Sequence, residues 1–169
     1  MPRQLLSWAG YPYFTQPLRR LAWAWVTWGV QGCFPTVTTL SPPELARWLQ
    51  QPAADLPLLL DARTAEEFAV SHLPQARHAP TLESALALDL APGQLIVVYC
   101  SVGYRSARLA AQLQQQGFTR VYNLVGSLFL WANQGRPLQQ DDQATRAVHP
   151  YSPVWGLLLA PQVDQKDRY

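Results

Sequence analysis

The most constraining stretch of this sequence is a short apolar run that ends at a cysteine. Residues 95–99 are Leu-Ile-Val-Val-Tyr, rich in β-branched side chains and preceded by an Ala-Pro-Gly turn. Such a run predicts a strand buried on both faces, as in a parallel sheet. Residues 106–116 place apolar side chains on one helical face, and Gly117 is a stop signal. A strand, a short loop that begins at Cys100 and a helix are therefore expected.

Strands and helices are expected to alternate around this unit. A helix capped by Ser41, a helix capped by Thr64 and a helix over residues 128–134 fit the capping and periodicity rules. This alternation predicts an α/β fold, with right-handed crossovers and a parallel sheet covered by helices. Three further apolar runs predict strands, at residues 37–40, 58–61 and 121–124.

The length of 169 residues predicts one domain with extensions. We place an apolar, Trp-rich N-terminal extension at residues 1–35, the α/β domain at 36–138, and a C-terminal strap and tail at 139–169. Within that last segment, residues 162–169 are expected to be disordered. We expect the strap to dock on the domain through three apolar side chains, Tyr151, Trp155 and Leu158.

The N-terminal extension leaves three interpretations open. Its apolar core, residues 21–30, is about half of the roughly 20 residues that span a bilayer. It can be a helix packed on the domain, an interfacial helix with Arg19 and Arg20 near lipid phosphates, or a secretory signal that ends near Cys33. We expect a cytoplasmic protein, with peripheral membrane contact through residues 1–33 as the alternative. Secretion or lipoprotein export fits less well.

Charge and composition exclude several classes of function. The net charge is +2 and no run of Lys or Arg forms a phosphate-binding patch, so no nucleic-acid partner is expected. The three histidines and the two cysteines, Cys33 and Cys100, lack metal-ligand spacing, so no metal is expected. No glycine-rich phosphate or dinucleotide loop is present, and we expect no cofactor. Two cysteines in such different contexts do not predict a disulfide.

The loop after Cys100 is predicted to bind an anion. A tight curl between strand and helix turns successive backbone N–H groups inward, and the helix adds its positive N-terminal end. Gly103 supplies the freedom that the turn needs. A thiol held there is expected to be deprotonated at neutral pH, without a general base. The residues expected to form this cradle are Ser101, Val102, Gly103, Tyr104, Arg105 and Ser106.

The length of the loop indicates which electrophile it accepts. A loop with five residues between cysteine and arginine can encircle the three oxygens of a phosphate. Here four residues separate Cys100 from Arg105, and the smaller cradle favours a persulfide sulfur. No acid is obvious near the loop to protonate a leaving group. Small phosphatase or arsenate reductase chemistry is therefore the minor alternative.

Three ordered motifs resemble those of the rhodanese sulfurtransferases. They are the loop from Cys100 to Ser106, an upstream signature (Leu-Asp-Ala-Arg at 60–63, Glu-Phe at 67–68, Ser-His-Leu-Pro-Gln-Ala at 71–76), and a closing signature (Leu-Val-Gly-Ser at 124–127, Trp131, Gly-Arg-Pro at 135–137). The resemblance covers about residues 36–138. It implies a three-layer rhodanese-like domain with a five-stranded parallel sheet and helices on both faces.

The resemblance also implies a reaction. Cys100 attacks a small sulfur donor, thiosulfate or similar, and the resulting persulfide passes its sulfur to a thiol- or cyanide-type acceptor, or to an acceptor protein. Loop amides hold the charge. Asp61 and Arg63 are implied to support the loop from the neighbouring strand end. A non-catalytic or partner-dependent sulfur-relay module is the alternative.

The sequence departs from the family pattern at several positions. Ser71 and Gln75 replace two glycines of the upstream motif, and Ser127 replaces the second glycine of a pair. These changes are expected to affect turns more than chemistry. Ser101 stands where thiosulfate-preferring members often have arginine, which weakens the case for thiosulfate.

Overall fold

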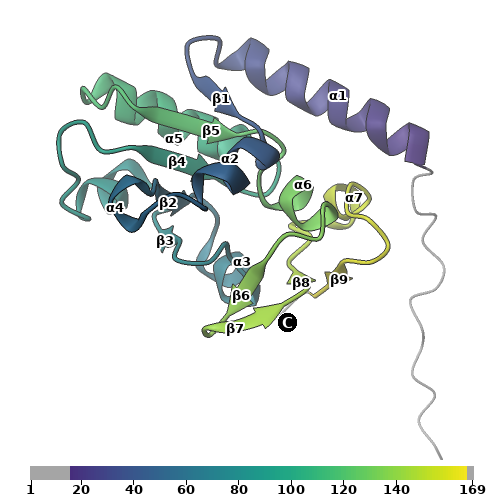
Figure 1. Cartoon of the computed structure of the whole chain (residues 1–169). Coiled ribbons are helices and arrows are strands. Elements are labelled where there is room, and N and C mark those ends of the chain that lie inside the picture. The colour runs from purple at the N-terminus through teal and green to yellow at the C-terminus, as the bar shows by residue number, and fades with distance from the viewer. Residues whose placement is uncertain (1–15, 167–169) are drawn as a thin grey trace, which may run out of the picture.

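A five-stranded parallel sheet forms the centre of the computed structural model, which describes residues 16–166 (Figure 1). The strand order is β1-β5-β4-β2-β3, and every pairing in this sheet is parallel. This confirms the predicted α/β class. The strands are β1 (Thr38–Leu40), β2 (Leu58–Asp61), β3 (Arg77–His78), β4 (Ile96–Tyr99) and β5 (Val121–Leu124).

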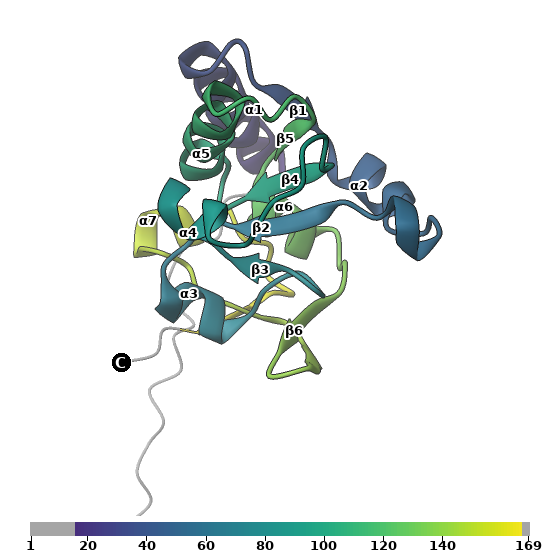
Figure 2. The same cartoon turned by 90° about the vertical axis from the view of Figure 1, so that its left-hand side faces the viewer.

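Helices cover both faces of the sheet and produce the expected three layers (Figure 2). Helices α2 and α6 pack on one face, and α4 and α5 on the other. A short 3-10 turn, Ala53–Asp55, precedes β2. The helices of the domain are α2 (Pro42–Trp48), α3 (Ala65–Val70), α4 (Leu82–Leu86), α5 (Tyr104–Gln115) and α6 (Ser127–Asn133).

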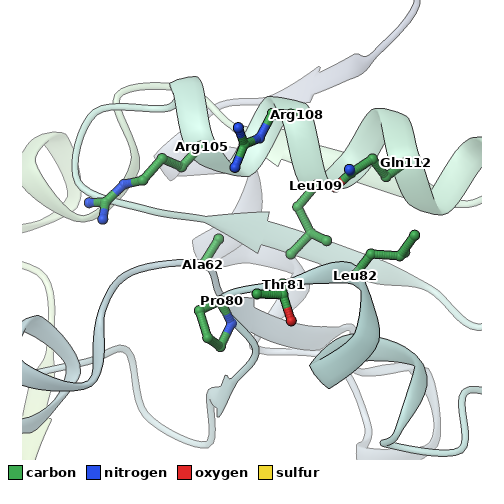
Figure 3. Close-up of a pocket in the computed structure, with 8 residues that line it drawn as sticks. All are labelled: Ala62, Pro80, Thr81, Leu82, Arg105, Arg108, Leu109 and Gln112. Carbon is green, nitrogen blue, oxygen red and sulfur yellow. The ribbon is translucent and has the colours of Figure 1, made fainter.

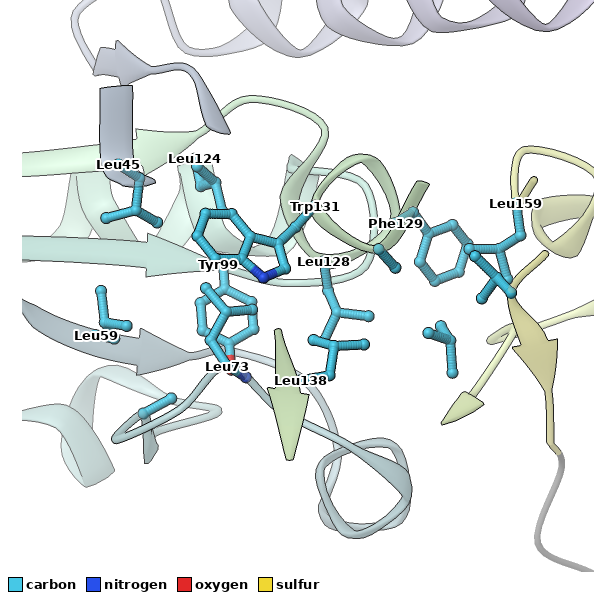
Figure 4. Close-up of a cluster of buried hydrophobic side chains, with 14 of the residues drawn as sticks. Leu45, Leu59, Leu73, Tyr99, Leu124, Leu128, Phe129, Trp131, Leu138 and Leu159 are labelled. Atoms are coloured by element: carbon cyan, nitrogen blue, oxygen red, sulfur yellow. The ribbon is translucent and has the colours of Figure 1, made fainter. Parts of the chain in front are cut away.

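Side chains of β4 alternate between two hydrophobic cores, as the period of two in a strand requires. Val97 and Tyr99 join the larger core, where Figure 4 shows Tyr99 beside Trp131 of α6. Ile96 and Val98 join the second core, under α4 and α5. Cys100 continues this alternation and belongs to the second core. The sulfur therefore lies on the face of the sheet that α5 covers.

Three helices begin with capping boxes, and for two of them, α2 and α3, the sequence predicted the N-cap residue. The Ser41 hydroxyl accepts the backbone N–H of Glu44, whose carboxylate accepts the N–H of Ser41. Thr64 and Glu67 repeat this exchange at the start of α3. Because the capping box fixes the carboxyl group of Glu67 at the helix N-terminus, its remaining lone pairs can reach a second element.

A buried ion pair follows β2. Arg63 Nη2 lies 2.6 Å from Asp61 Oδ2, and neither side chain is exposed to solvent. The same nitrogen donates to the carbonyl of Ser71 at 2.5 Å. Burial opposes the charge of Arg63, yet the Asp61 carboxylate raises its pKa above the ordinary value. Losing one partner of such a pair costs about 3–5 kcal/mol, so both residues hold this end of the sheet together.

The structure corrects two predicted helix starts. The helix expected from Ser106 begins at Tyr104, because Gly103 takes a backbone φ of 118° and allows the chain to enter the helix at once. The helix expected from Leu128 begins at Ser127. Strand β3 lacked a sequence signal, since it is a two-residue edge strand without an apolar run.

The C-terminal segment is ordered further than predicted. It forms a hairpin of β6 (Leu138–Gln140) and β7 (Gln143–Thr145), then a helical turn, α7 (Pro153–Gly156). Strands β8 (Ala147–Val148) and β9 (Asp164–Gln165) pair in parallel. The prediction of disorder is therefore wrong for residues 162–166, while residues 167–169 lie outside the described part.

The strap docks on the larger core through two of its three predicted side chains. Leu158 is buried and Trp155 is half-buried in that core. Asn133 of α6 fixes the strap by donating to the carbonyl of Leu158 at 2.8 Å and accepting the N–H of Ala160 at 2.7 Å. Tyr151, the third predicted contact, is 52% exposed and lies outside that core, against the guanidinium of Arg105.

Helix α1 (Gln16–Cys33) lies along the outside of the domain (Figure 1). Ala22, Trp23 and Val26 pack against the larger core, which agrees with the packed interpretation. Arg19 is buried and donates to the carbonyl of Leu159 at 3.5 Å, so the interpretation that places Arg19 near lipid phosphates is wrong for this residue. Residues 1–15 of the proposed membrane segment lie outside the described part. Within residues 16–166, no helix is both long and apolar enough to cross a membrane.

Candidate active site

Cys100 lies at the carboxyl end of β4, where the loop turns into α5. Cys100 is almost fully buried, with 1% of its surface exposed to solvent. The sulfur accepts the backbone N–H of Gly103 at 3.2 Å, and the Ser106 hydroxyl lies 3.4 Å away. The loop therefore curls around the sulfur, as the sequence predicted, and two donors from the loop point to it.

Helix α6 holds the backbone of this loop from the opposite side. The N–H groups of Leu128 and Phe129 donate to the carbonyls of Cys100 and Ser101 at 3.0 and 3.1 Å. The Ser127 hydroxyl accepts the N–H of Cys100 at 3.1 Å. Because the carbonyls of Cys100 and Ser101 point towards α6, N–H groups of the loop can point towards the sulfur.

Ser127 has a larger role than the sequence suggested. Its φ is 49°, in the left-handed region, and Gly126 before it has a φ of 63°. This backbone explains why a glycine pair suits the position. Besides accepting from Cys100, the Ser127 hydroxyl donates to the carbonyl of Leu124 at 3.1 Å. The replacement of glycine therefore adds a direct contact to the loop as well as changing a turn.

A buried amide completes the support of the sulfur. Asn123 of β5 donates to the carbonyl of Gly103 at 3.1 Å and accepts the Ser106 hydroxyl at 2.7 Å. A hydroxyl has one proton, so Ser106 donates to either Asn123 or the Cys100 sulfur at any moment. Negative charge on the sulfur favours the second bond, because charged acceptors bind hydrogen more strongly.

Arg105 is paired with a carboxylate instead of closing the cradle over the sulfur. Its two terminal nitrogens donate to the two oxygens of Glu67 at 2.7 and 2.8 Å. The Ser101 hydroxyl donates to Glu67 at 2.7 Å, and the backbone N–H of Thr64 donates at 3.0 Å. One carboxylate from α3 thus joins both ends of the loop to a neighbouring helix.

The strap contributes one side chain to this cluster. The guanidinium of Arg105 lies over the ring of Tyr151, 4.9 Å from its centre. Tyr151 has a backbone φ of 64°, which is unfavourable for a residue other than glycine, and is held by contacts around it. Its N–H donates to His149 Nδ1 at 3.0 Å. Glu67 and Tyr151 therefore hold Arg105 on two sides.

The remaining predicted residues lie farther from the sulfur. Val102 packs against the larger core, and Tyr104 is half exposed, with its ring 5.3 Å from that of Phe34. Asp61 pairs with Tyr99 in the sheet, one residue before Cys100. Asp61 and Arg63 thus support the strand beneath the loop and form no hydrogen bond with the sulfur. Cys33 is exposed at the end of α1 and, like Cys100, is a free thiol.

The environment lowers the pKa of the Cys100 thiol. Burial alone would raise this pKa, because it disfavours the charged form. The hydroxyl of Ser106, the charge of Arg105 and the N–H groups of Ser106 and Gly103 together outweigh burial and favour the thiolate. This direction agrees with the sequence prediction and requires no general base.

Glu67 is ionised at neutral pH. Burial disfavours its charge, but hydrogen bonds from Arg105 and Ser101 are stronger and hold the pKa of Glu67 at about 2. The sequence suggested that no acid lies near the loop, and Glu67 corrects that expectation. A carboxylate with so low a pKa has no proton to give to a leaving group at pH 7.

A pocket of about 260 Å³ opens beside the loop, between α5 and the segment after β3 (Figure 3). Arg105 and Arg108 are both on its α5 side, and Thr81 and Gln112 add polar groups. Among the residues that line it, none is acidic. Arg108 is exposed and takes part in no ion pair within residues 16–166. The pocket therefore suits an anionic small molecule.

Three contacts of the loop were not identified from the sequence. They are those made by Glu67, by Asn123 and by the Ser127 hydroxyl. The capping box made Glu67 visible as a helix-start residue, but its pairing with Arg105 spans 38 positions. Asn123 interrupts an otherwise apolar strand, and such a buried amide was the available signal. Within the described residues, no cluster of His, Cys, Asp or Glu could hold a metal.

Known proteins share this fold and part of this sequence. A family model that describes the Rhodanese-like domain matches residues 41–134. A sulfurtransferase from Allochromatium vinosum is 38% identical over 82 residues, covering 48% of this chain and 77% of that protein. The thiosulfate sulfurtransferase GlpE of Pseudomonas aeruginosa is 40% identical over 93 residues, covering 53% and 79%. A rhodanese-like domain protein from Staphylococcus aureus superposes with a TM-score of 0.54 at 21% identity, covering 63% of this chain and 100% of that one.

Titration of Cys100 tests the cradle. In a Cys33→Ser background, the rate of alkylation by iodoacetamide should show an inflection below the value of about 8.5 for a free cysteine. Ser106→Ala should move the inflection to higher pH, since it removes a donor to the sulfur. Ser101→Ala, whose hydroxyl donates to Glu67 instead, should move it less. An inflection at the free-cysteine value would contradict the proposed stabilisation of the thiolate.

The low pKa of Glu67 predicts how stability depends on pH. Its pKa is about 2 in the folded chain and about 4.3 in an unfolded chain. Its ionised form therefore stabilises the fold fully above the unfolded value, and this contribution is lost as pH falls through the folded value. Chemical denaturation of wild type and Glu67→Gln should show a constant difference in unfolding free energy above about pH 5 that shrinks towards pH 2. When the comparison is repeated in an Arg105→Gln background, the Glu67→Gln difference in unfolding free energy should depend less on pH. The same dependence on pH in both backgrounds would contradict the pairing of Glu67 with Arg105.

Proposed function

The chain belongs to the rhodanese-like domain family, and we propose that it is a sulfurtransferase that carries sulfane sulfur on Cys100. The observation that carries this proposal is the cradle of donors around a buried sulfur at the end of the central strand. The Gly103 N–H and the Ser106 hydroxyl both reach that sulfur. Sulfurtransferases of about 40% identity support the class of reaction.

The first step transfers sulfur to the protein. The Cys100 thiolate attacks the outer sulfur of thiosulfate, a new S–S bond forms, and the bond between the two sulfurs of the donor breaks. Sulfite leaves with the electron pair, and Cys100 keeps a persulfide with one negative charge. No proton is transferred, which suits a site where Glu67, the carboxylate bound to the loop, is already ionised.

The second step returns the thiolate. A nucleophilic acceptor, such as cyanide or a thiolate, attacks the outer sulfur of the persulfide and takes it away as thiocyanate or as a new persulfide. The electron pair of the broken bond returns to Cys100. The Gly103 N–H and the Ser106 hydroxyl stabilise the negative charge that remains at the protein sulfur.

The pocket beside α5 supports an anionic donor. Both terminal nitrogens of Arg105 donate hydrogen bonds to Glu67, so they are already engaged. Arg108, on the next turn of the helix, is the cation that faces the pocket without an ion-pair partner among the described residues. We propose that Arg108 binds the anionic end of the donor while its sulfur approaches Cys100.

A sulfur relay between proteins is the second candidate. The 1% exposure of Cys100 and the strap residue Tyr151 near Arg105 favour an acceptor that is specifically fitted to the site. Phosphatase or arsenate reductase chemistry has less support. Glu67 is ionised, so it would not protonate a leaving oxygen at neutral pH.

Intact mass spectrometry tests the persulfide directly. Incubation with thiosulfate or mercaptopyruvate should add one sulfur atom to the wild-type chain, and cyanide should remove it. Cys100→Ser should take up no sulfur, because the serine hydroxyl stays protonated. Cys33→Ser is the matched control and should behave as wild type.

Three outcomes would alter this assignment. Sulfur uptake by Cys100→Ser would place the nucleophile elsewhere. Uptake only from a persulfidated protein donor would favour the relay. Hydrolysis of an aryl phosphate that is lost in Cys100→Ser would favour phosphatase chemistry.

Substitution of Arg108 tests the donor pocket. Arg108→Gln should raise KM for thiosulfate by about tenfold, since a hydrogen bond between charged groups is lost, and should change kcat little. Arg120→Gln is the control, because Arg120 is exposed and directly precedes β5, at the amino ends of the strands and away from the loop at their carboxyl ends. Equal values of KM in both variants would show that Arg108 does not bind the donor.

A further inference from the structure

Helix α1 has an outer face that the domain does not cover. Four large apolar side chains on it are exposed: Leu18 by 51%, Leu21 by 60%, Trp25 by 70% and Trp28 by 69%. Their spacing of three, four and three residues places them on one side of the helix. We call these four residues the α1 stripe. It is a continuous apolar surface that extends over about three helical turns.

The two tryptophans of the α1 stripe form one projecting unit. Their rings pack edge to face, with centres 5.7 Å apart at an angle of 88°. An indole has an apolar body and one N–H donor, which suits the boundary between lipid headgroups and acyl chains. Single exposed apolar residues are common on proteins, but a contiguous group of this kind marks a binding surface.

The charged side chains within α1 and in the sequence before it have one sign. No Asp or Glu occurs before Glu44, whereas Arg3, Arg19 and Arg20 are all cationic. Arg19 is buried against the carbonyl of Leu159, but Arg20 is exposed. In residues 1–15 the charged side chain is the cation Arg3, and four residues are aromatic, namely Trp8, Tyr11, Tyr13 and Phe14. This region therefore complements an anionic surface.

We propose that α1 binds an anionic lipid surface. The helix lies flat, with the α1 stripe at the level of the headgroup–acyl boundary and Arg20 near lipid phosphates. Since no helix within residues 16–166 is long and apolar enough to span a bilayer, α1 lies on the membrane instead of crossing it. This proposal is independent of the sulfur chemistry.

A second copy of the chain fits the α1 stripe less well. Pairing two copies would bring cations together without any acid from this region to compensate them. A coiled-coil seam needs three or more heptads, and an 18-residue helix supplies fewer. A standard interface buries about 800 Å² per partner, more than four side chains on one helix provide.

The inner face of α1 keeps this surface apart from the catalytic loop. Thr27 and Val30 of the helix lie against Val102 and Gly103, with a gap of only about 10 Å³ between them. Substitutions of the exposed tryptophans therefore leave the packed side of the helix intact. This allows membrane binding to be tested without disturbing Cys100.

Flotation of the full-length chain with vesicles tests the proposal. Vesicles of phosphatidylcholine with phosphatidylglycerol should bind the wild type, and salt should weaken the binding. The double variant Trp25→Ser/Trp28→Ser should bind at least about tenfold more weakly, because the apolar contact is lost. Arg20→Glu should weaken binding several-fold and reduce its dependence on salt. Leu86→Ser is the matched control, since Leu86 is an exposed leucine on α4.

The controls separate membrane binding from folding and self-association. All variants should keep the wild-type melting temperature, and tryptophan emission of the wild type should shift to shorter wavelength on anionic vesicles only. Absence of flotation, equal binding to pure phosphatidylcholine, or full binding by the double variant would each overturn the proposal. A concentration-dependent dimer in sedimentation that the double variant abolishes would assign the α1 stripe to a second copy and overturn it too.

Discussion

The carboxylate of Glu67 is the contact on which the geometry of the active-site loop depends. It accepts hydrogen bonds from Thr64 in its own helix and from Ser101 and Arg105 in the loop. A buried carboxylate is costly without partners, and each of these donors is in turn satisfied by it. The start of α3 and the loop around Cys100 are therefore ordered together. The same pairing engages the guanidinium of Arg105. Arg108 is then the cation lining the pocket that has no ion-pair partner among the described residues.

A second polar network holds the loop from the side of α6. Asn123, Ser106 and Ser127 are all buried, and their hydrogen bonds join β5, α5 and α6 around one sulfur. In such a site of low polarity, each donor has a stronger effect than in water. Burial alone would favour a neutral thiol, and these fixed donors reverse that preference. Dipoles that are fixed in advance thus favour the thiolate of Cys100 without a general base.

The sequence allowed the framework of the domain to be predicted, because its signals are local. The apolar runs of β2, β4 and β5 and the capping boxes of α2 and α3 lie within a few residues. Cys100 and its loop followed from a strand, a glycine and a helix in succession. The partners of the loop could not be predicted in this way, since Glu67 meets Arg105 only after the sheet has formed. Docking of the strap was predicted for Trp155 and Leu158, but its hydrogen bonds to Asn133 span 25 and 27 positions. Its last residues are ordered by the pairing of β9 with β8, which no local signal predicts.

The contact between Arg19 and the carbonyl of Leu159 joins positions 140 residues apart. Protein synthesis proceeds from the N-terminus, so α1 leaves the ribosome long before the segment on which it packs. The inner apolar face of α1 therefore cannot complete its packing until the residues around Leu159 have been made. Contacts of such long sequence separation also slow folding, because a large loop must close first. The nascent chain consequently exposes Trp23, on the inner face of α1, until that segment has been made, whereas Trp25 and Trp28 stay exposed in the folded chain as well.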